Sequence, residues 1–387
     1  MQINNIFKKY NYIMEKIIYN IIKKERGDKV SRIDDAFKLL EDGLKRGVYP
    51  GAVACVGDRY GIIKSLSLGT LGKNNSIPVN HDTMFDLASL TKVVATTPII
   101  VKMLEQGKIS LYDLVSDYLE EFRENDELRI IHLLTHTSGF EAFSDLYNKC
   151  DHMREVVEYI SKSKRTCQIG KEVVYSDYNF ILLKEIAEKI LNKPFEVVAN
   201  EYVFEPLSMN NTKFNPKNTS NIACTEFDSI TGRYLKGIVH DENARFFGGV
   251  SGHAGLFSNI KDLSKYCEMY LNLGRDHVGK MFMGKRSIDM IRHNYTYGLE
   301  ESRGIGFCVK DYENSSGGEL MSKGAIGHTG FTGTSMWIDF ELGVYIVLLS
   351  NRVNLGRENN KIIKLRRHFH NAVINSIEEK NFNKNIH

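Results

Sequence analysis

A serine and a lysine three residues apart, Ser89 and Lys92, stand at the start of an apolar run with helical spacing. Residues three apart on a helix share a face, so the two side chains should lie together. A serine in the first turn also lies near unpaired backbone N–H groups and the positive end of the helix dipole. A buried lysine that has lost its charge can accept the serine proton, so the pair predicts a nucleophile with its base.

The same spacing recurs twice more in this lysine-rich chain, at Ser161/Lys164 and at Ser258/Lys261. The first repeat lies in a polar run that is typical of a solvated helix end. The second begins a helix predicted over 258–273, where Ser258 is better explained as the N-cap. We therefore expect the chemistry at Ser89.

Histidines and carboxylates raise the alternative of a metal site. His132 and His136 lack a carboxylate or third histidine at ligand spacing, which favours a hydrogen-bonded turn at a helix end. His240, Asp241 and His253 could bind a metal, but the glycines between 248 and 255 indicate first a tight loop. We predict neither a metal nor a cofactor, with a metal hydrolase built on His240, Asp241 and His253 as an alternative.

Composition excludes some partners and suggests a compartment. The 387 residues carry a net charge of only +3, and no basic cluster is interleaved with aromatic residues, so nucleic acid is not expected as a partner. The six cysteines are far apart and form no Cys-x-x-Cys pair. They indicate free thiols in a reducing compartment.

The first 24 residues alternate isoleucines and lysines at helical spacing. They have no uninterrupted apolar core or small-residue cleavage site, so they do not resemble a secretory signal. Such a helix could make peripheral contact with an anionic membrane surface. We favour a helix packed on the domain, or leader sequence before an alternative start at Met14. Since no stretch is long and apolar enough to span a bilayer, a cytoplasmic protein is expected.

The periodicity at the two ends of the chain differs from that in the middle. Strand patterns near both ends enclose a mainly helical middle, which predicts an α+β fold with one antiparallel sheet built from both chain termini and an inserted helical lobe. The expected strands are 51–57, 62–68, 304–309, 334–340 and 344–350, and the expected helices include 33–44, 111–122, 153–161, 180–193, 195–204, 258–273 and 358–377.

Three motifs carry a resemblance to a known family. They are Ser89-Leu90-Thr91-Lys92, Tyr175-Ser176-Asp177 and His328-Thr329-Gly330. In this order and at these separations they resemble the serine β-lactamase-related family, in its class C and DD-peptidase branch. The resemblance implies a β-lactamase/transpeptidase-like fold.

The resemblance also implies a domain organisation. A single hydrolase domain would cover 31–380, after a basic amphipathic extension over 1–30. Its α/β lobe would comprise about 31–85 and 300–380, and its helical lobe about 95–295.

Roles for individual residues follow from the resemblance. Ser89 would be the acylated nucleophile, with Lys92 as its general base or proton relay. Tyr175 would shuttle a proton between serine, leaving group and water, since a phenol beside an ammonium group should have a lowered pKa. The backbone N–H groups of Ser89 and of Phe331, expected on a strand after Gly330, would form the oxyanion hole.

Two positions depart from the family pattern. Asp177 stands where asparagine is common, and His328 stands where β-lactamases usually have lysine. A neutral histidine binds a carboxylate less well than a permanent cation does, which argues against efficient β-lactam hydrolysis. The predicted substrate-binding residues are Asp177, His328, Thr329, Gly330, Phe331 and, at the mouth of a loop over the site, His253.

The resemblance implies a metal-independent serine hydrolase that forms an acyl-enzyme with an ester or a cell-wall-type peptide or amide. Its partner would be a small molecule: an ester, a β-lactam or a muropeptide. Two alternatives remain open, a class C-like β-lactamase and a non-catalytic penicillin-binding sensor or assembly protein. The presence of Ser89, Lys92 and Tyr175 together argues against the sensor.

Overall fold

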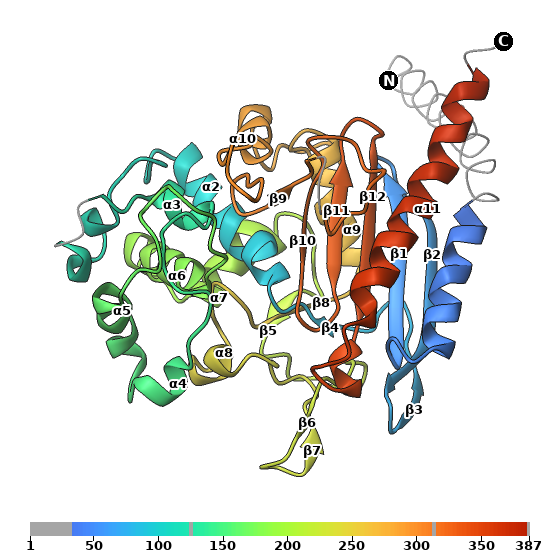
Figure 1. Cartoon of the computed structure of the whole chain (residues 1–387), viewed down its shortest axis with the longest axis horizontal. Helices are drawn as coiled ribbons and strands as arrows, with labels where there is room; N and C mark the ends of the chain where they lie inside the picture. Colours follow the sequence, from blue (N-terminus) through green and yellow to red (C-terminus); the bar gives the residue numbers. More distant parts are fainter. Residues whose placement is uncertain (1–32, 124–126, 312–314, 385–387) are drawn as a thin grey trace, which may run out of the picture.

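The structure is a computed structural model that describes residues 33–123, 127–311 and 315–384 (Figure 1). The extension predicted over 1–30 lies outside the described residues. Among the helices described, none is both long enough and apolar enough to cross a membrane.

One seven-stranded sheet joins the two ends of the chain. Every neighbouring pair is antiparallel, in the order β3-β2-β1-β12-β11-β10-β9. The first strands of the chain therefore pair directly with the last ones, as predicted. The strands are β1 (Gly51–Asp58), β2 (Gly61–Gly72), β3 (Asn75–Pro78), β9 (Cys308–Val309), β10 (Ile326–Thr329), β11 (Ser335–Asp339) and β12 (Val344–Ser350).

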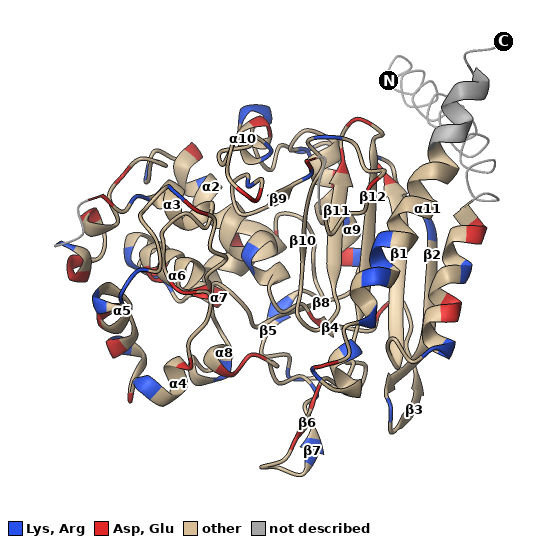
Figure 2. Ribbon diagram, viewed as in Figure 1, with Lys and Arg blue, Asp and Glu red and all other residues tan. Residues whose placement is uncertain are grey.

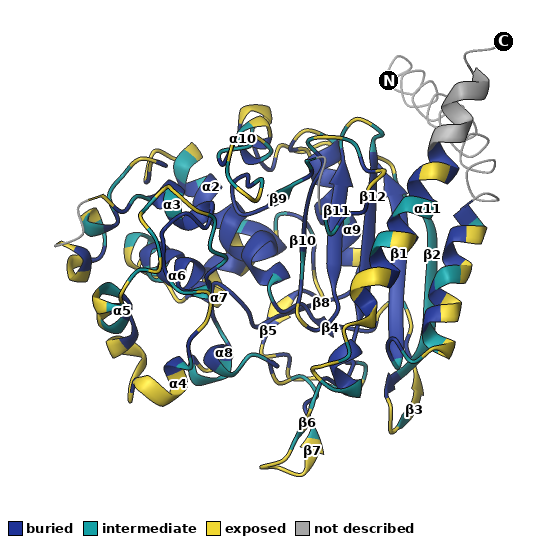
Figure 3. Ribbon diagram, viewed as in Figure 1, coloured by how far each residue is buried: buried dark blue, intermediate teal, exposed yellow. Residues whose placement is uncertain are grey.

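Alternating side chains of β1 serve two different cores. Val53 and Cys55 belong to the large core shared with the helical lobe, whereas Ala54 and Val56 belong to a second core. Side chains along a strand point alternately to opposite faces, so one strand can serve both. The second core packs the helix over 33–45 and α11 (Lys361–Lys384) on one face, and α9 (Ile260–Leu271) lies on the other. Figure 3 shows the central strands as buried.

The helical lobe lies beside the β10 and β9 edge of the sheet (Figure 1). Short strands β4 (Phe85–Asp86), β8 (Leu256–Ser258) and β5 (Lys213–Phe214) form a small sheet, and β6 (Phe227–Asp228) pairs with β7 (Arg233–Tyr234). The helices of the lobe are η1 (Lys92–Thr96), α2 (Thr97–Glu105), η2 (Val115–Asp117), η3 (Glu120–Phe122), α3 (Ile130–Leu134), α4 (Leu146–Lys149), α5 (Met153–Lys162), α6 (Asp177–Leu191), α7 (Phe195–Ala199), η4 (Asn200–Phe204), α8 (Glu242–Phe246) and α10 (Lys285–Ile291).

The predicted fold class is confirmed, but several elements differ from expectation. The helix expected over 111–122 is two single 3₁₀ turns, because Asp113 and Asp117 accept hydrogen bonds from the backbone N–H groups of Ser110 and Leu114. Of the strand expected over 304–309, only Cys308–Val309 forms.

Two further expectations near the motifs also need correction. Ser258 is not an N-cap, because it lies in β8; Asn259 caps α9 by accepting the N–H of Asp262. The segment over 326–329 was not predicted as a strand, yet it forms β10, with Gly327 packed against the indole of Trp337.

Candidate active site

Ser89 lies at a sharp bend between β4 and the helical run that starts at residue 90. The preceding residue, Ala88, has φ of +46°, in the left-handed region that non-glycine residues rarely adopt. The carboxylate of Asp86 accepts the N–H of Ala88 at 2.8 Å and holds this bend. The strained backbone thus presents Ser89 at the edge of the helical lobe.

Lys92 is fully buried and begins a π-helical turn, η1. Its Nζ donates to three acceptors: Ser89 Oγ at 3.1 Å, Asp177 Oδ1 at 2.7 Å and the carbonyl of His253 at 3.2 Å. Three donors and three acceptors satisfy the ammonium group completely. The predicted pairing of Ser89 with Lys92 is therefore present in the structure.

The charge of Lys92 differs from the sequence-based expectation of a neutral lysine. Burial alone would lower the pKa of Lys92, but the carboxylate of Asp177, together with Tyr175, raises it above its ordinary value. The carboxylate at 2.7 Å and the Tyr175 phenol together stabilise the ammonium form more than burial destabilises it. Lys92 is therefore protonated in the free protein.

Tyr175 lies beside the ammonium group of Lys92. Its ring centroid is 4.9 Å from Lys92 Nζ, and its buried hydroxyl has no hydrogen-bond partner in the described part of the chain. Burial raises the pKa of Tyr175, and the Lys92 ammonium opposes this only in part. The expected lowering of the Tyr175 pKa is thus wrong, because burial outweighs the neighbouring charge.

His136 supports the segment that carries Tyr175 and Asp177. Its Nδ1 accepts the N–H of Ser176 at 3.1 Å and contacts Asn179 Nδ2 at 3.0 Å, while its ring lies 4.5 Å from that of Tyr175. Burial, aided by the cations of Arg303 and Lys92, lowers the pKa of His136 well below its usual range. The imidazole is neutral and acts as a hydrogen-bond acceptor at the turn after α3, in agreement with the predicted structural role.

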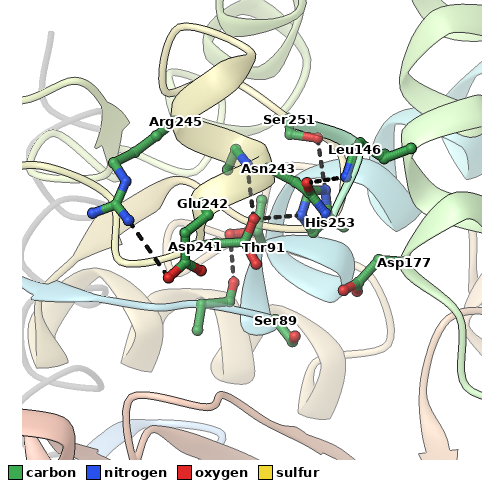
Figure 4. A network of polar contacts seen from close by, with 12 residues as sticks. Ser89, Thr91, Leu146, Asp177, Asp241, Glu242, Asn243, Arg245, Ser251 and His253 are labelled. Carbon is green, nitrogen blue, oxygen red and sulfur yellow. Dashed lines mark hydrogen bonds and ion pairs between the residues drawn. The ribbon is translucent and has the colours of Figure 1, made fainter. Parts of the chain in front are cut away.

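A chain of polar contacts fixes the side chain of His253 (Figure 4), the residue whose carbonyl accepts from Lys92 Nζ at 3.2 Å. His253 Nε2 lies 2.9 Å from Asp241 Oδ1, and its Nδ1 lies 2.7 Å from Ser251 Oγ. Burial would raise the pKa of Asp241, but His253 and the N–H of Ala244 lower it below its usual range. His253 is buried and does not line the cleft, so its predicted place at the mouth is wrong.

The three residues of the metal alternative, His240, Asp241 and His253, do not form one group of possible ligands in the described structure. His240 lies apart from His253 and pairs with Glu226. The group whose ligand atoms lie within 4.8 Å of one another is Asp177, Asp241 and His253. Lys92 already donates to Asp177, and Asp241 is bound by His253 and a backbone N–H, so a cation there would compete with the ammonium group.

Asp86 is a positioning residue that the sequence analysis did not single out. It is fully buried, and burial raises its pKa although it accepts the N–H of His240 at 2.6 Å as well as that of Ala88. The carboxylate therefore ties the bend before Ser89 to the loop that precedes α8. The only sequence signal was an acidic residue inside an otherwise apolar run.

The turn after β10 is bound to the same bend. Thr332 Oγ1 donates to the carbonyl of Asp86 at 2.7 Å, and Thr334 Oγ1 donates to that of Leu87 at 3.0 Å. Gly330 is required here, because a Cβ atom would lie 2.4 Å from the Leu87 carbonyl oxygen. Phe331 lies in this turn and not on a strand, which corrects the expectation.

The N–H groups of Ser89 and Phe331 donate no hydrogen bond to the described part of the chain. The half-exposed ring of Phe331 lies between the ring of His240, 5.6 Å away, and the guanidinium of Arg352, 4.7 Å away. Arg352 Nε also donates to the Phe331 carbonyl at 2.9 Å. The turn is thus held rigidly beside Ser89, with two N–H groups available to a bound group.

His328 presents a lone pair and not a positive charge. Its Nδ1 lies 2.8 Å from the carbonyl of Thr329, which can only accept, so Nδ1 carries the hydrogen and Nε2 is the acceptor. Burial, with the cations of Arg303 and Lys92, lowers the pKa of His328 well below its usual range. His328 is therefore neutral and supplies no positive charge for a carboxylate group.

A cleft of about 1050 Å³ connects these groups. Ser89, Tyr175, His328, Thr329, Gly330 and Phe331 all line it, so the structure brings together most of the predicted site. It also contains Arg303 and Arg366, which sequence reasoning missed. Each is a single arginine outside the motifs, and no pattern placed it near Ser89.

Comparisons with known proteins agree with this architecture. A model of the Beta-lactamase family matches residues 36–370. An N-acetylmuramyl-L-alanine amidase of Bacillus subtilis is 30% identical over 382 residues, covering 88% of this chain and 85% of the relative. A protein of Salmonella enteritidis, provisionally named D-alanyl-D-alanine carboxypeptidase, is 34% identical over 319 residues, with 74% and 73% covered.

Solved structures share the fold at lower identity. A β-lactamase/D-alanine carboxypeptidase from Pseudomonas syringae has a TM-score of 0.70 at 17% identity, covering 87% of this chain and 98% of the other. This chain therefore resembles the solved structure in the arrangement of both lobes.

Proposed function

Because this chain belongs to the Beta-lactamase family and is a serine hydrolase of that class, we propose that Ser89 forms an acyl-enzyme with an ester or amide substrate. The observation that carries the proposal is the 3.1 Å contact between Ser89 Oγ and the buried ammonium of Lys92. Neither of the other two serines that have a lysine three residues later has this setting. Ser161 is half-buried and Lys164 is exposed. Lys261, which follows Ser258, pairs with Asp82 on the surface.

A protonated Lys92 acts as a relay. As Ser89 Oγ attacks the carbonyl carbon, its proton passes to Lys92 Nζ, which hands one of its own to Asp177 Oδ1 at 2.7 Å. Proton transfer along preformed hydrogen bonds lowers the barrier to attack. This assignment gives Asp177, the departure from the family asparagine, the role of proton acceptor.

Tyr175 then serves the second half of the reaction. Its high pKa keeps the phenol protonated, so it can donate to the leaving oxygen or nitrogen as the tetrahedral intermediate collapses. The N–H groups of Ser89 and Phe331 stabilise the oxyanion of that intermediate. Water hydrolyses the acyl-enzyme by the reverse sequence of proton transfers.

The named activities of the relatives suggest the substrate class. The names of two relatives, N-acetylmuramyl-L-alanine amidase and D-alanyl-D-alanine carboxypeptidase, both denote cleavage of an amide bond, so we propose a cell-wall-type peptide or amide, or an ester, as substrate. β-Lactam hydrolysis is the second candidate, favoured by the arginines beside His328. The cytoplasmic location remains a prediction.

Turnover of a substrate panel tests the proposal. The panel is a p-nitrophenyl ester, a D-Ala-D-Ala peptide, a muramyl peptide and nitrocefin, assayed with and without a metal chelator. We expect steady turnover of at least one ester or amide, undiminished by the chelator. Stoichiometric binding without turnover would support a sensor instead, and loss of activity with the chelator would favour the metal alternative.

A further inference from the structure

A second pocket lies outside the cleft, between α11 and the turn that follows the helix over 33–45. Its volume is about 370 Å³, within the range of about 300 to 1,000 Å³ that is usual for small-molecule sites. None of its lining residues lines the cleft that contains Ser89, so the two are separate. We call it the basic pocket, and its lining residues are Arg46, Val48, Lys361, Lys364, Leu365 and His368.

The spacing of residues along α11 explains why the basic pocket forms. Four of its lining residues have the spacing i, i+3, i+4 and i+7 of a single helix face. That face packs on the helix over 33–45 through Leu365, which approaches Gly43 so closely that a Cβ atom there would lie 2.5 Å from the leucine Cδ2. The glycine therefore lets the two helices come together beneath the pocket.

The pocket has an apolar floor and a basic rim. Its two apolar residues, Val48 and Leu365, are buried, and its exposed residues are Arg46, Lys361, Lys364 and His368. Lys361 is held in place, because its Nζ donates to the Arg46 carbonyl at 3.2 Å. Arg46 uses only its Nε, which donates to the Asp42 carbonyl at 3.3 Å. Lys364 makes no hydrogen bond or ion pair in the described part of the chain, so its ammonium group is available to a ligand.

Carboxylates are scarce around the basic pocket. No aspartate or glutamate lines it, and the sequence has none from 359 to 377. The carboxylate of Asp42 accepts from Lys45 at 3.3 Å, and Glu358 is exposed in the turn before α11. Figure 2 shows lysines and arginines along the first half of α11. The positive end of the dipole of this 24-residue helix lies at Lys361 and adds to the charge of the rim.

We propose that the basic pocket binds a phosphate group, either of a phosphate-bearing small molecule or of an anionic phospholipid headgroup. Lysine ammonium groups are compact charges that suit phosphate, and a guanidinium can donate two parallel hydrogen bonds to it. A phosphate dianion gains more from several cations on one rim than a carboxylate with a single charge does. The apolar floor accommodates the organic part of the ligand. This site goes beyond the proposed function and shares no residue with the cleft.

Calorimetric titration of the full chain tests the site without requiring turnover. The probes are inorganic phosphate and acetate at one ionic strength and at a mildly alkaline pH, where phosphate is a dianion. We expect phosphate to bind at one site per chain and at least tenfold more tightly than acetate. Equal affinities for the two anions, or tighter binding of acetate, would overturn the proposal.

Variants assign the binding to the basic pocket. Lys364→Met and Arg46→Met should each weaken phosphate binding by roughly tenfold, because each removes charge-assisted hydrogen bonds. Lys285→Met removes an exposed charge from the first turn of α10 and is the matched control, which should bind phosphate as the natural protein does. Unchanged affinity in both pocket variants, or an equal loss in the control, would overturn the proposal. A loss confined to Arg366→Met would place the anion in the cleft and would also overturn it.

Vesicle sedimentation distinguishes the two sources of the phosphate group. The protein is mixed with vesicles of phosphatidylcholine alone, or of phosphatidylcholine and phosphatidylglycerol in equal parts. Binding of inorganic phosphate without sedimentation assigns the pocket to a small molecule. Sedimentation with the anionic vesicles that Lys364→Met reduces and Lys285→Met does not assigns it to a lipid headgroup. If phosphate does not bind, absent sedimentation, or sedimentation that Lys364→Met leaves unchanged, would overturn the proposal.

Melting temperatures complete the test. The three substituted side chains of the pocket variants and their control are exposed, so each variant should melt at the temperature of the natural protein. Weaker binding then reflects the lost charge and not unfolding. Because no step of the test depends on acylation of Ser89, its failure leaves the proposed function standing, and failure of the substrate panel leaves the phosphate site standing.

Discussion

The two walls of the cleft differ in whether their charged side chains are paired. On the helical-lobe side, Lys92 has three acceptors and Asp177 has its cation, so each charge is matched. On the sheet side, Arg366 has no partner in the described structure and Arg303 uses only one nitrogen. Matched groups at hydrogen-bond distance suit proton transfer within the protein, whereas unmatched donors suit a ligand that brings its own charge.

Removing the ammonium group of Lys92 from the paired wall should reduce turnover more than the other substitutions below. Lys92→Met removes the relay and leaves the Asp177 carboxylate without its cation, so turnover of a neutral ester should fall by roughly 100-fold to 10,000-fold. The measurement is kcat/KM, with the melting temperature as a control for folding. Tyr175→Phe keeps the ring and removes only the proton donor, so its loss should lie near the lower limit. A near-normal rate in a folded Lys92→Met variant would exclude the relay.

Asp177→Asn tests the role of Asp177 as proton acceptor through the pH dependence of the rate. In the natural protein the raised pKa of Lys92 lies above the neutral range, so activity should be flat from about pH 6 to 9. Without the carboxylate, burial lowers the pKa of Lys92, and the lysine must lose its own proton to act as base. The rate of the variant should then rise with pH, up to roughly tenfold for each unit below the new pKa. Parallel profiles of the two proteins would contradict the assignment.

The smallest effect is expected at His328. Because its pKa lies well below 6.5, it stays neutral, and the ratio of kcat/KM for nitrocefin to that for a neutral p-nitrophenyl ester should not change between about pH 5.5 and 8.5. The permanent charge of the arginines would give the same flat ratio. A ratio that rises as the pH falls through about 6.5 would show that His328 titrates and supplies the charge after all.

Local patterns in the sequence predicted the reacting groups but not their electrostatics. The three-residue spacing of Ser89 and Lys92 at the start of one helical run predicted their contact, and the strand patterns at both ends of the chain predicted the sheet. The charge state of Lys92 depends instead on Asp177, 85 residues away, and on complete burial. No local pattern contains those two facts, so the expected neutral lysine was wrong.

The gathering of unpaired donors on the sheet side of the cleft could not be predicted from the sequence for the same reason. Arg303 lies in a loop, Arg366 on the last helix and Trp337 on β11, and only the folded sheet brings them to one cleft. Short elements held by side-chain to backbone bonds, such as the turns over 115–122, also escaped prediction, because hydrophobic periodicity does not describe them. Asp86 was overlooked because its two carboxylate oxygens accept the N–H groups of Ala88 and His240, which become neighbours only on folding.

Covalent labelling of Ser89 tests the central claim most directly. The natural protein is treated with a fluorophosphonate or a labelled penicillin and digested, and the modified peptide is identified by mass spectrometry. We expect the adduct on the peptide that contains Ser89, and no adduct in Ser89→Ala, which keeps Lys92 and Tyr175 in place. A label on Ser161 or Ser258, or one that persists in Ser89→Ala, would contradict the account.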